Sequence, residues 1–158
     1  MNELLEQVEA LLKNEPNREK ALAQVIQVVL TKFNSETGTI HRLHEPTQWL
    51  RLVAQVGLPP QLLDMVKVIP VGKGIAGQVI ATGQPVTMCN LQTDTSGVAK
   101  PGAKQTGVGG ALCVPIHDGE KIVGTLGIGT RREHEYTPEE TRALEDIGRS
   151  LGAQIHSD

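Results

Sequence analysis

Two helical hydrophobic patterns open the chain. The first set of apolar residues has the i, i+1, i+4, i+7, i+8 spacing of one helix face: Leu4, Leu5, Val8, Leu11 and Leu12. A second set with helical periodicity follows after a break: Ala21, Leu22, Val25, Ile26, Val29, Leu30 and Phe33. Pro16 separates the two sets, because proline removes an amide donor and pushes its predecessor out of the helical region. The pattern therefore predicts two amphipathic helices within residues 1–36.

Alternating and β-branched residues replace the helical spacing further along the chain. The strand-like ranges are 39–43, 50–56, 85–89, 111–116 and 121–130. Proline is tolerated on an edge strand, so Pro85 makes its range a short edge strand. The dipeptide Asp118-Gly119 lies between two hydrophobic runs, which is the strongest short-range signal for a β-hairpin. We therefore expect the last two ranges to pair with each other.

Two short helices and one long helix complete the predicted elements. One short helix is expected to begin at Pro59-Pro60 and another to cover 75–82, with 69–74 as a tight connection between them. The sequence Thr137-Pro138-Glu139-Glu140 is a capping box with proline at the first helical position, so it opens the final helix. Residues 90–109 are polar and have no period, and a connection of this length inside a compact domain is typically a functional lid.

The order of these elements predicts an α+β fold, in which helices cover the faces of a mostly antiparallel sheet. A length of 158 residues is typical of one domain, and the sequence contains no internal repeat. We assign the N-terminal helices to 1–36, the sheet, short helices and lid to 37–135, and the C-terminal helix to 136–158. Together they form a single domain over residues 1–158.

Composition and charge exclude several classes of protein. The net charge of −3 and the 2 % aromatic content offer neither a basic face nor the stacking platforms of nucleic-acid-binding proteins. No stretch approaches the roughly 18 consecutive apolar residues that cross a membrane, and the acidic start of the chain differs from a secretory signal. Two cysteines are too few for a disulfide framework. We expect a cytoplasmic protein with no nucleic-acid or membrane partner.

Four stretches of the sequence resemble the GAF domain family. Residues 69–77 (Ile-Pro-Val-Gly-Lys-Gly-Ile-Ala-Gly) and 83–86 (Gly-Gln-Pro-Val) resemble the mid-domain signature of that family. Residues 114–126 resemble its closing hairpin, and residues 136–144 (Tyr-Thr-Pro-Glu-Glu-Thr-Arg-Ala-Leu) resemble its last helix. The resemblance implies a six-stranded antiparallel sheet with the terminal helices on one face. On the other face it implies short helices and a lid loop, with a ligand pocket beneath them.

The same resemblance implies a function in signal transduction. Members of the family commonly bind a small molecule, dimerise through the terminal helices and regulate effector proteins. We therefore expect a non-catalytic sensor with an unidentified small-molecule ligand, a homodimeric state and an effector protein in trans. A purely structural dimerisation domain is one alternative. We expect no catalytic residue, no cofactor and no metal.

A redox enzyme is the alternative from another functional class. One branch of the family, the free methionine-R-sulfoxide reductases, uses redox cysteines. In that branch one cysteine lies within the glycine motif, where this sequence has Ala76, and the main catalytic cysteine lies in the loop before the penultimate strand, where 90–109 has none. Cys89 and Cys113 are out of register with both positions. Cys113 also lies in an apolar strand, which is the setting of an unreactive core thiol.

Patterns that suggest other cofactors have simpler explanations. The range 72–77 fits the GxGxxG pattern of dinucleotide-binding loops, but Pro70 interrupts the preceding segment and only a short helix follows. The glycines are therefore expected to allow a tight turn. Bilin-binding members of the family attach the pigment through a cysteine followed by histidine, a dipeptide that this sequence lacks. His41 and His44 are three residues apart in a strand, which places them on opposite faces and prevents them from sharing a metal.

Two glycines lie four residues apart in the predicted C-terminal helix. Each of Gly148 and Gly152 costs about 1 kcal/mol of helix stability relative to alanine. Close approach of another element would explain this choice of residue. That element is either the sheet or a partner helix, and the sequence leaves both open.

Alternation in the predicted hairpin divides its side chains between two faces. The bulky set is expected under the long helices: Leu112, Val114, Ile116, Ile122, Leu126 and Ile128. The smaller set faces the other way: Ala111, Cys113, Pro115, Val123, Thr125 and Gly127. Ligand pockets are mostly apolar with a few placed polar groups, so we hypothesise that Thr39, His41, Cys113 and Thr125 line a pocket beneath the lid. The alternative is that the short helices and lid side chains fill this face.

Overall fold

The computed structural model describes residues 2–60, 63–72, 74–88 and 109–155. Its helices are α1 (Asn2–Asn14), α2 (Arg18–Phe33), α3 (Leu63–Val66), α4 (Gly74–Thr82) and α5 (Pro138–Ile155). Its strands are β1 (Thr37–His44), β2 (Trp49–Val56), β3 (Val68–Pro70), β4 (Val86–Met88), β5 (Ala111–Asp118) and β6 (Lys121–Gly129). These residues confirm the predicted α+β class.

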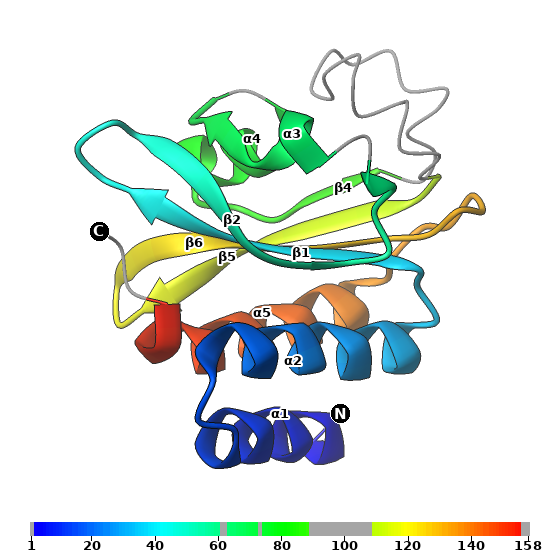
Figure 1. Cartoon of the computed structure of the whole chain (residues 1–158). Coiled ribbons are helices and arrows are strands. Elements are labelled where there is room, and N and C mark those ends of the chain that lie inside the picture. The colour runs from blue at the N-terminus through cyan, green and yellow to red at the C-terminus, as the bar shows by residue number, and fades with distance from the viewer. Residues whose placement is uncertain (1, 61–62, 73, 89–108, 156–158) are drawn as a thin grey trace.

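The strands form one antiparallel sheet in the order β3-β2-β1-β6-β5-β4. Helices α2 and α5 cover one face, and α3 and α4 lie on the other (Figure 1). Helix α1 forms an outer layer beyond α2 and α5 (Figure 1). The predicted lid, 90–109, lies outside the described residues except for Gly109. None of the described helices has the length and apolarity that a membrane crossing requires.

The ends of the long helices follow from local sequence. The Asn17 side chain accepts a hydrogen bond from the amide of Lys20 at 3.0 Å, which caps the start of α2. The predicted capping box at α5 is present, with Thr137 Oγ1 accepting from the Glu140 amide at 3.1 Å. In return, Glu140 Oε1 accepts from the Thr137 amide at 2.9 Å. Both caps satisfy amides that a helix end leaves free.

The segment after α3 corrects one expectation. Residues 69–74 were expected to form only a tight connection, but Val68–Pro70 is a strand that pairs with β2, in register with Trp49 opposite Pro70. A proline fits here because β3 is an edge strand and needs no outward donor. Three residues are too few to show an alternating pattern, so the sequence carried no strand signal.

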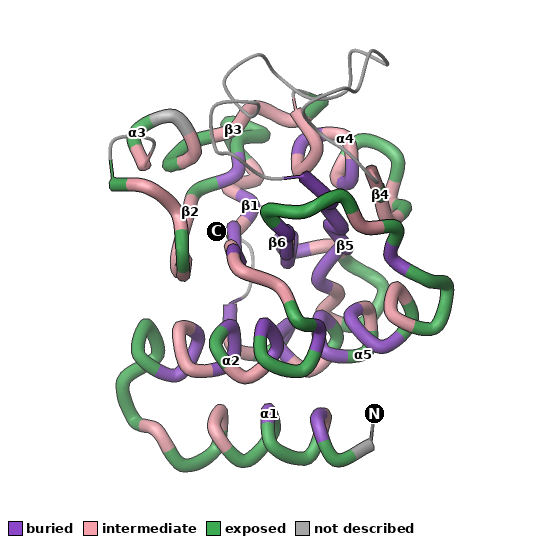
Figure 2. Tube along the Cα trace, turned by 90° about the vertical axis from the view of Figure 1, so that its right-hand side faces the viewer, coloured by how far each residue is buried: buried purple, intermediate pink, exposed green. Residues whose placement is uncertain are grey.

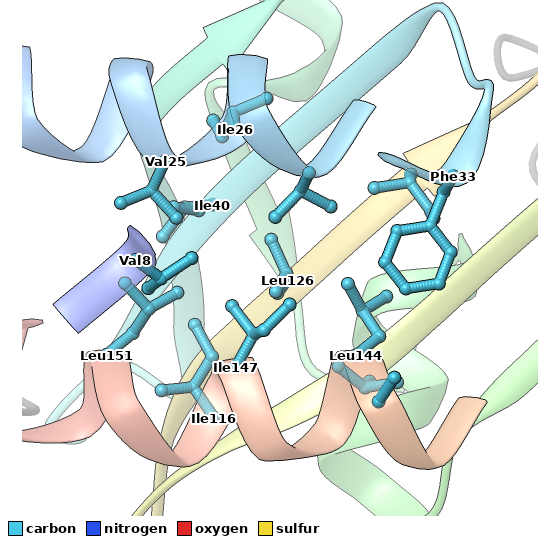
Figure 3. Packing of buried hydrophobic residues seen from close by; sticks show 14 of the residues in the cluster. Val8, Val25, Ile26, Phe33, Ile40, Ile116, Leu126, Leu144, Ile147 and Leu151 are labelled. Atoms are coloured by element: carbon cyan, nitrogen blue, oxygen red, sulfur yellow. The ribbon is translucent and has the colours of Figure 1, made fainter. Parts of the chain in front are cut away.

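The bulky side chains of the hairpin pack under the long helices as predicted, with one correction. Leu126 and Ile116 meet Ile147 and Leu144 of α5 in the main hydrophobic cluster (Figure 3). Near the turn of the hairpin, the pairing of β5 with β6 shifts by one residue between Ile116 and His117, and this shift interrupts the alternation of side chains.

The shift moves two residues to faces other than those expected. Ile122 was expected on the helix-covered face, but its side chain lies against Gly83 at the end of α4. Val123 was expected with the small set, but it belongs to the main hydrophobic cluster. An extra residue in one strand inverts the alternation beyond it, so period-two reasoning fails there.

The two glycines of α5 lie against the sheet. A Cβ built on Gly148 would lie 2.9 Å from the carbonyl oxygen of Pro115, and one built on Gly152 would overlap the carbonyl oxygen of His117. Both neighbours belong to β5. The sequence left two explanations for these glycines, packing on the sheet or on a partner helix. The structure shows that they pack on the sheet.

Candidate ligand-binding site

The sheet brings the four candidate residues together. Thr39 and His41 come from β1, Thr125 from β6 and Cys113 from β5, and β6 lies between the other two strands. His41 is directly opposite Thr125 in the register. Gly127 is opposite both Thr39 and Cys113, and a Cβ built on it would lie 3.2 Å from Thr39 Oγ1 and 3.7 Å from Cys113 Sγ. The four side chains thus share the face that carries α3 and α4.

His41 connects the sheet to helix α3. The residue is 2 % exposed, and its Nε2 lies 2.8 Å from the carbonyl oxygen of Val66, the last residue of α3. A carbonyl only accepts, so Nε2 carries the proton and donates to a helix-end group that has no partner within its helix. Burial lowers the pKa of His41 to about 4, and the bond to Val66 opposes that shift only in part. The ring is therefore neutral at pH 7.

Two polar atoms at this place have no hydrogen-bond partner among the residues that the structure describes. His41 Nδ1 is a buried acceptor, and Thr125 Oγ1 belongs to a side chain that is fully buried. The Thr125 hydroxyl lies close enough to the Cys113 thiol to lower the pKa of that thiol, but sulfur is only a weak acceptor for it. Leaving such a group unsatisfied typically costs about 1–3 kcal/mol, and native proteins rarely do so. Within the described part of the chain, both atoms are therefore free to take a further hydrogen-bond partner.

Cys113 is an unreactive thiol in this environment. It is 5 % exposed, and burial raises its pKa to about 12, with the nearby Thr125 hydroxyl opposing part of the rise. Only the thiolate is a good nucleophile, so Cys113 is poorly suited to redox or nucleophilic chemistry at neutral pH. Cys89 lies outside the described residues.

Two other sequence patterns are the histidine pair of β1 and the glycines of 72–77. His44 does not join His41, because its Nδ1 lies 2.7 Å from Thr47 Oγ1 in the exposed turn after β1. Within the described residues, no group of three His, Cys, Asp or Glu side chains is arranged to hold a metal ion. The Gly72 amide donates to the Gly77 carbonyl at 2.9 Å, and a Cβ on Gly77 would lie 2.6 Å from the Pro70 carbonyl oxygen. These glycines allow the tight turn into α4.

Sequence reasoning missed the partner of His41. The group that fixes the ring is the backbone carbonyl of Val66, which is 25 positions away and would be present with any side chain there. No residue type signals such a contact in advance.

Comparison with known proteins identifies the family. Residues 15–156 match the family model of the GAF domain, so the chain belongs to the GAF domain family. No curated protein matches the sequence.

Solved structures share this fold at low sequence identity. The GAF domain of a phosphoenolpyruvate-protein phosphotransferase from Coxiella burnetii is 20 % identical, with a TM-score of 0.82 over 97 % of this chain and 90 % of that one. The free methionine-R-sulfoxide reductase of Neisseria meningitidis, solved with its substrate, is 18 % identical, with a TM-score of 0.81 over 98 % and 87 %. The nlh2 GAF domain of A. aeolicus, in an inactive state, is 20 % identical, with a TM-score of 0.77 over 96 % and 92 %. The likeness concerns the fold, which sensors and reductases share.

Proposed function

We propose that this GAF domain is a non-catalytic, cytoplasmic signalling module that binds a small molecule on the α3/α4 face of its sheet. The observation that supports this function is a pair of buried atoms, His41 Nδ1 and Thr125 Oγ1, for which the described residues provide no hydrogen-bond partner. A bound molecule would complete both hydrogen bonds. Because the His41 ring also holds the end of α3 through Val66, a ligand that moves the ring would move that helix. An effector protein acting in trans would detect the change.

Filling the site should abolish ligand binding. We expect at least one member of a metabolite panel to stabilise the wild-type protein, by about 2.7 kcal/mol at a ligand concentration of 100 Kd. Cys113→Trp places a bulky side chain beside Thr125 and should remove that stabilisation, whereas Cys113→Ala should keep it. Thermal unfolding with and without the panel measures both variants. Where the tryptophan variant does not fold, Thr125→Val takes its place. Equal stabilisation of all variants, or none of the wild type, would contradict the proposal.

The proposal that the domain is not an enzyme rests on its cysteines. Ala76 replaces the cysteine of the reductase motif, and the Cys113 thiol is protonated at neutral pH. We expect no thiol-dependent turnover of free methionine-R-sulfoxide by the purified protein, as measured by a coupled reductant assay with a known reductase as positive control. Turnover that disappears in the Cys89→Ser, Cys113→Ser double variant would establish the enzyme instead.

We also propose that the domain is a homodimer through its helical layer. Leu4 and Val8 of α1 are buried within the chain, at 2 % and 0 % exposed, and Leu5 and Leu12 remain partly exposed. Figure 2 shows that α1 is exposed along its outer side, with its buried residues turned towards α2. A groove of about 380 Å³ also runs between α1 and α2, with Leu11 among its lining residues. A second copy would cover these apolar positions.

A charge on this surface should separate the two copies. We expect wild-type protein at micromolar concentration to scatter light with twice the chain mass. The combined Leu5→Glu, Leu12→Glu variant should scatter with a single chain mass, because the carboxylates would be buried at the interface. Glu6→Gln, an exposed neighbour on the same helix, is the matched control and should leave the mass unchanged. A monomeric wild type would contradict dimerisation.

A further inference from the structure

We infer that the ligand of this site is an uncharged molecule with an N–H or O–H donor beside an acceptor, of the kind that a lactam presents. The inference rests on the proposed function and deepens it by naming the ligand class. It follows from what each group at the site offers.

His41 offers a hydrogen-bond acceptor. A neutral imidazole has one protonated and one bare nitrogen, and the bond to the Val66 carbonyl places the proton on Nε2. The bare Nδ1 has no hydrogen-bond partner in the described ranges of the chain. The ligand must therefore donate a hydrogen bond to Nδ1, and a molecule with only acceptors would meet a lone pair there.

Thr125 offers the complementary group beside it. His41 and Thr125 are directly opposite on β1 and β6, so their Cβ atoms lie about 4.5–5.5 Å apart. The Thr125 hydroxyl can rotate from the Cys113 sulfur, a weak acceptor, and donate to an acceptor on the ligand. An N–H and a C=O on the same edge of a cis amide match this pair, with N–H towards Nδ1 and C=O towards Oγ1.

The described residues around the site favour an uncharged ligand. Of the four candidate residues, Thr39 and Thr125 are hydroxyls, His41 is a neutral ring and Cys113 is a protonated thiol. Gly127 and Pro115 are their neighbours across the strands. An anion would face the Nδ1 lone pair without a cation, and a cation would find no carboxylate among these residues. Burying an unpaired ion is far more costly than burying a neutral amide whose bonds are made.

Matched small probes test this inference on the intact wild-type chain. The probes are 2-pyrrolidinone, its N-methyl analogue, which lacks the donor, and acetate, which carries the charge. Two-bond ¹H–¹⁵N correlation spectra of the labelled protein report the ring nitrogens of His41. In the free protein we expect a protonated Nε2 and a bare Nδ1. Saturable addition of 2-pyrrolidinone should move the Nδ1 resonance towards that of a hydrogen-bonded nitrogen.

The affinities should separate the probes by at least about tenfold, the equivalent of one lost hydrogen bond. Acetate and N-methyl-2-pyrrolidinone should bind more weakly than 2-pyrrolidinone, and Thr125→Val should weaken the binding of 2-pyrrolidinone. The inference is overturned if Nδ1 carries the proton, if the three probes bind equally, or if Nδ1 is already hydrogen-bonded and ignores every probe, as a buried water would cause. If one of these results is obtained while a panel metabolite still stabilises the protein, the inference about the ligand class fails but the proposed function does not. If neither the probes nor any panel metabolite binds, both the proposed function and the inferred ligand class are contradicted.

Discussion

Replacing Gly152 with alanine is expected to destabilise the domain by about 3 kcal/mol or more, the upper part of the range for overpacked cores. On an exposed helix the same change would gain about 1 kcal/mol. The sign reverses here because the new Cβ would overlap the His117 carbonyl oxygen of β5, a backbone atom that cannot rotate away. The helix would have to lift from the sheet, and its buried neighbours Leu151 and Ile155 would lose contacts.

Urea denaturation measures this effect, with two variants of the same helix beside it. Gly148→Ala should be milder, because its Cβ would lie 2.9 Å from the Pro115 carbonyl oxygen rather than overlapping it. Ser150→Ala, away from the sheet contact, should stay within about 0.5 kcal/mol of wild type. Unchanged stability of Gly152→Ala would mean that α5 does not pack on β5 in this way.

Acid should weaken the fold through His41. Burial lowers the pKa of His41 from 6.5 to about 4, so between these values the unfolded chain binds a proton that the folded chain does not. The folded state therefore has its full stability, as far as His41 is concerned, above pH 6.5. It loses stability progressively as the pH falls towards 4. The loss is about 2 kcal/mol at pH 5 and about 3 kcal/mol below pH 4, because each pKa unit corresponds to roughly 1.4 kcal/mol.

The variant His41→Gln isolates this contribution. A glutamine amide can donate to the Val66 carbonyl as Nε2 does, but it has no proton to gain in this range. Free energies of unfolding at pH 7 and pH 5 should therefore differ by about 2 kcal/mol more in the wild type than in the variant. Parallel pH dependences of the two proteins would show that His41 is not the titrating group.

Periodicity was sufficient to predict most of the secondary structure. Helices α2 and α5 carry long, regular apolar faces with local capping residues, and Asp118-Gly119 marks the hairpin turn, where Gly119 has a φ of 66°. The same reasoning failed where the pattern was too short or was interrupted. Strand β3 has only three residues, and the register shift after Ile116 inverted the faces of Ile122 and Val123. Both the existence of β3 and the faces of Ile122 and Val123 depend on pairing with a neighbouring strand, which local periodicity does not report.

The candidate site was predictable only in part for a similar reason. Alternation placed Thr39, His41, Cys113 and Thr125 on one face, and the sheet register brings them together. What the alternation could not predict is the hydrogen bond from His41 to the Val66 carbonyl, which fixes the tautomer of the ring. That bond depends on how α3 folds back over the sheet.

Native mass spectrometry of the freshly purified protein tests the central claim most directly. We predict a population whose mass exceeds that of the chain by one small, uncharged molecule, lost on collisional activation and absent from Cys113→Trp, with Cys113→Ala as the control that retains it. Bare chain mass in every variant, both as purified and after incubation with the metabolite panel, would contradict the claim that this face of the sheet is a ligand-binding site.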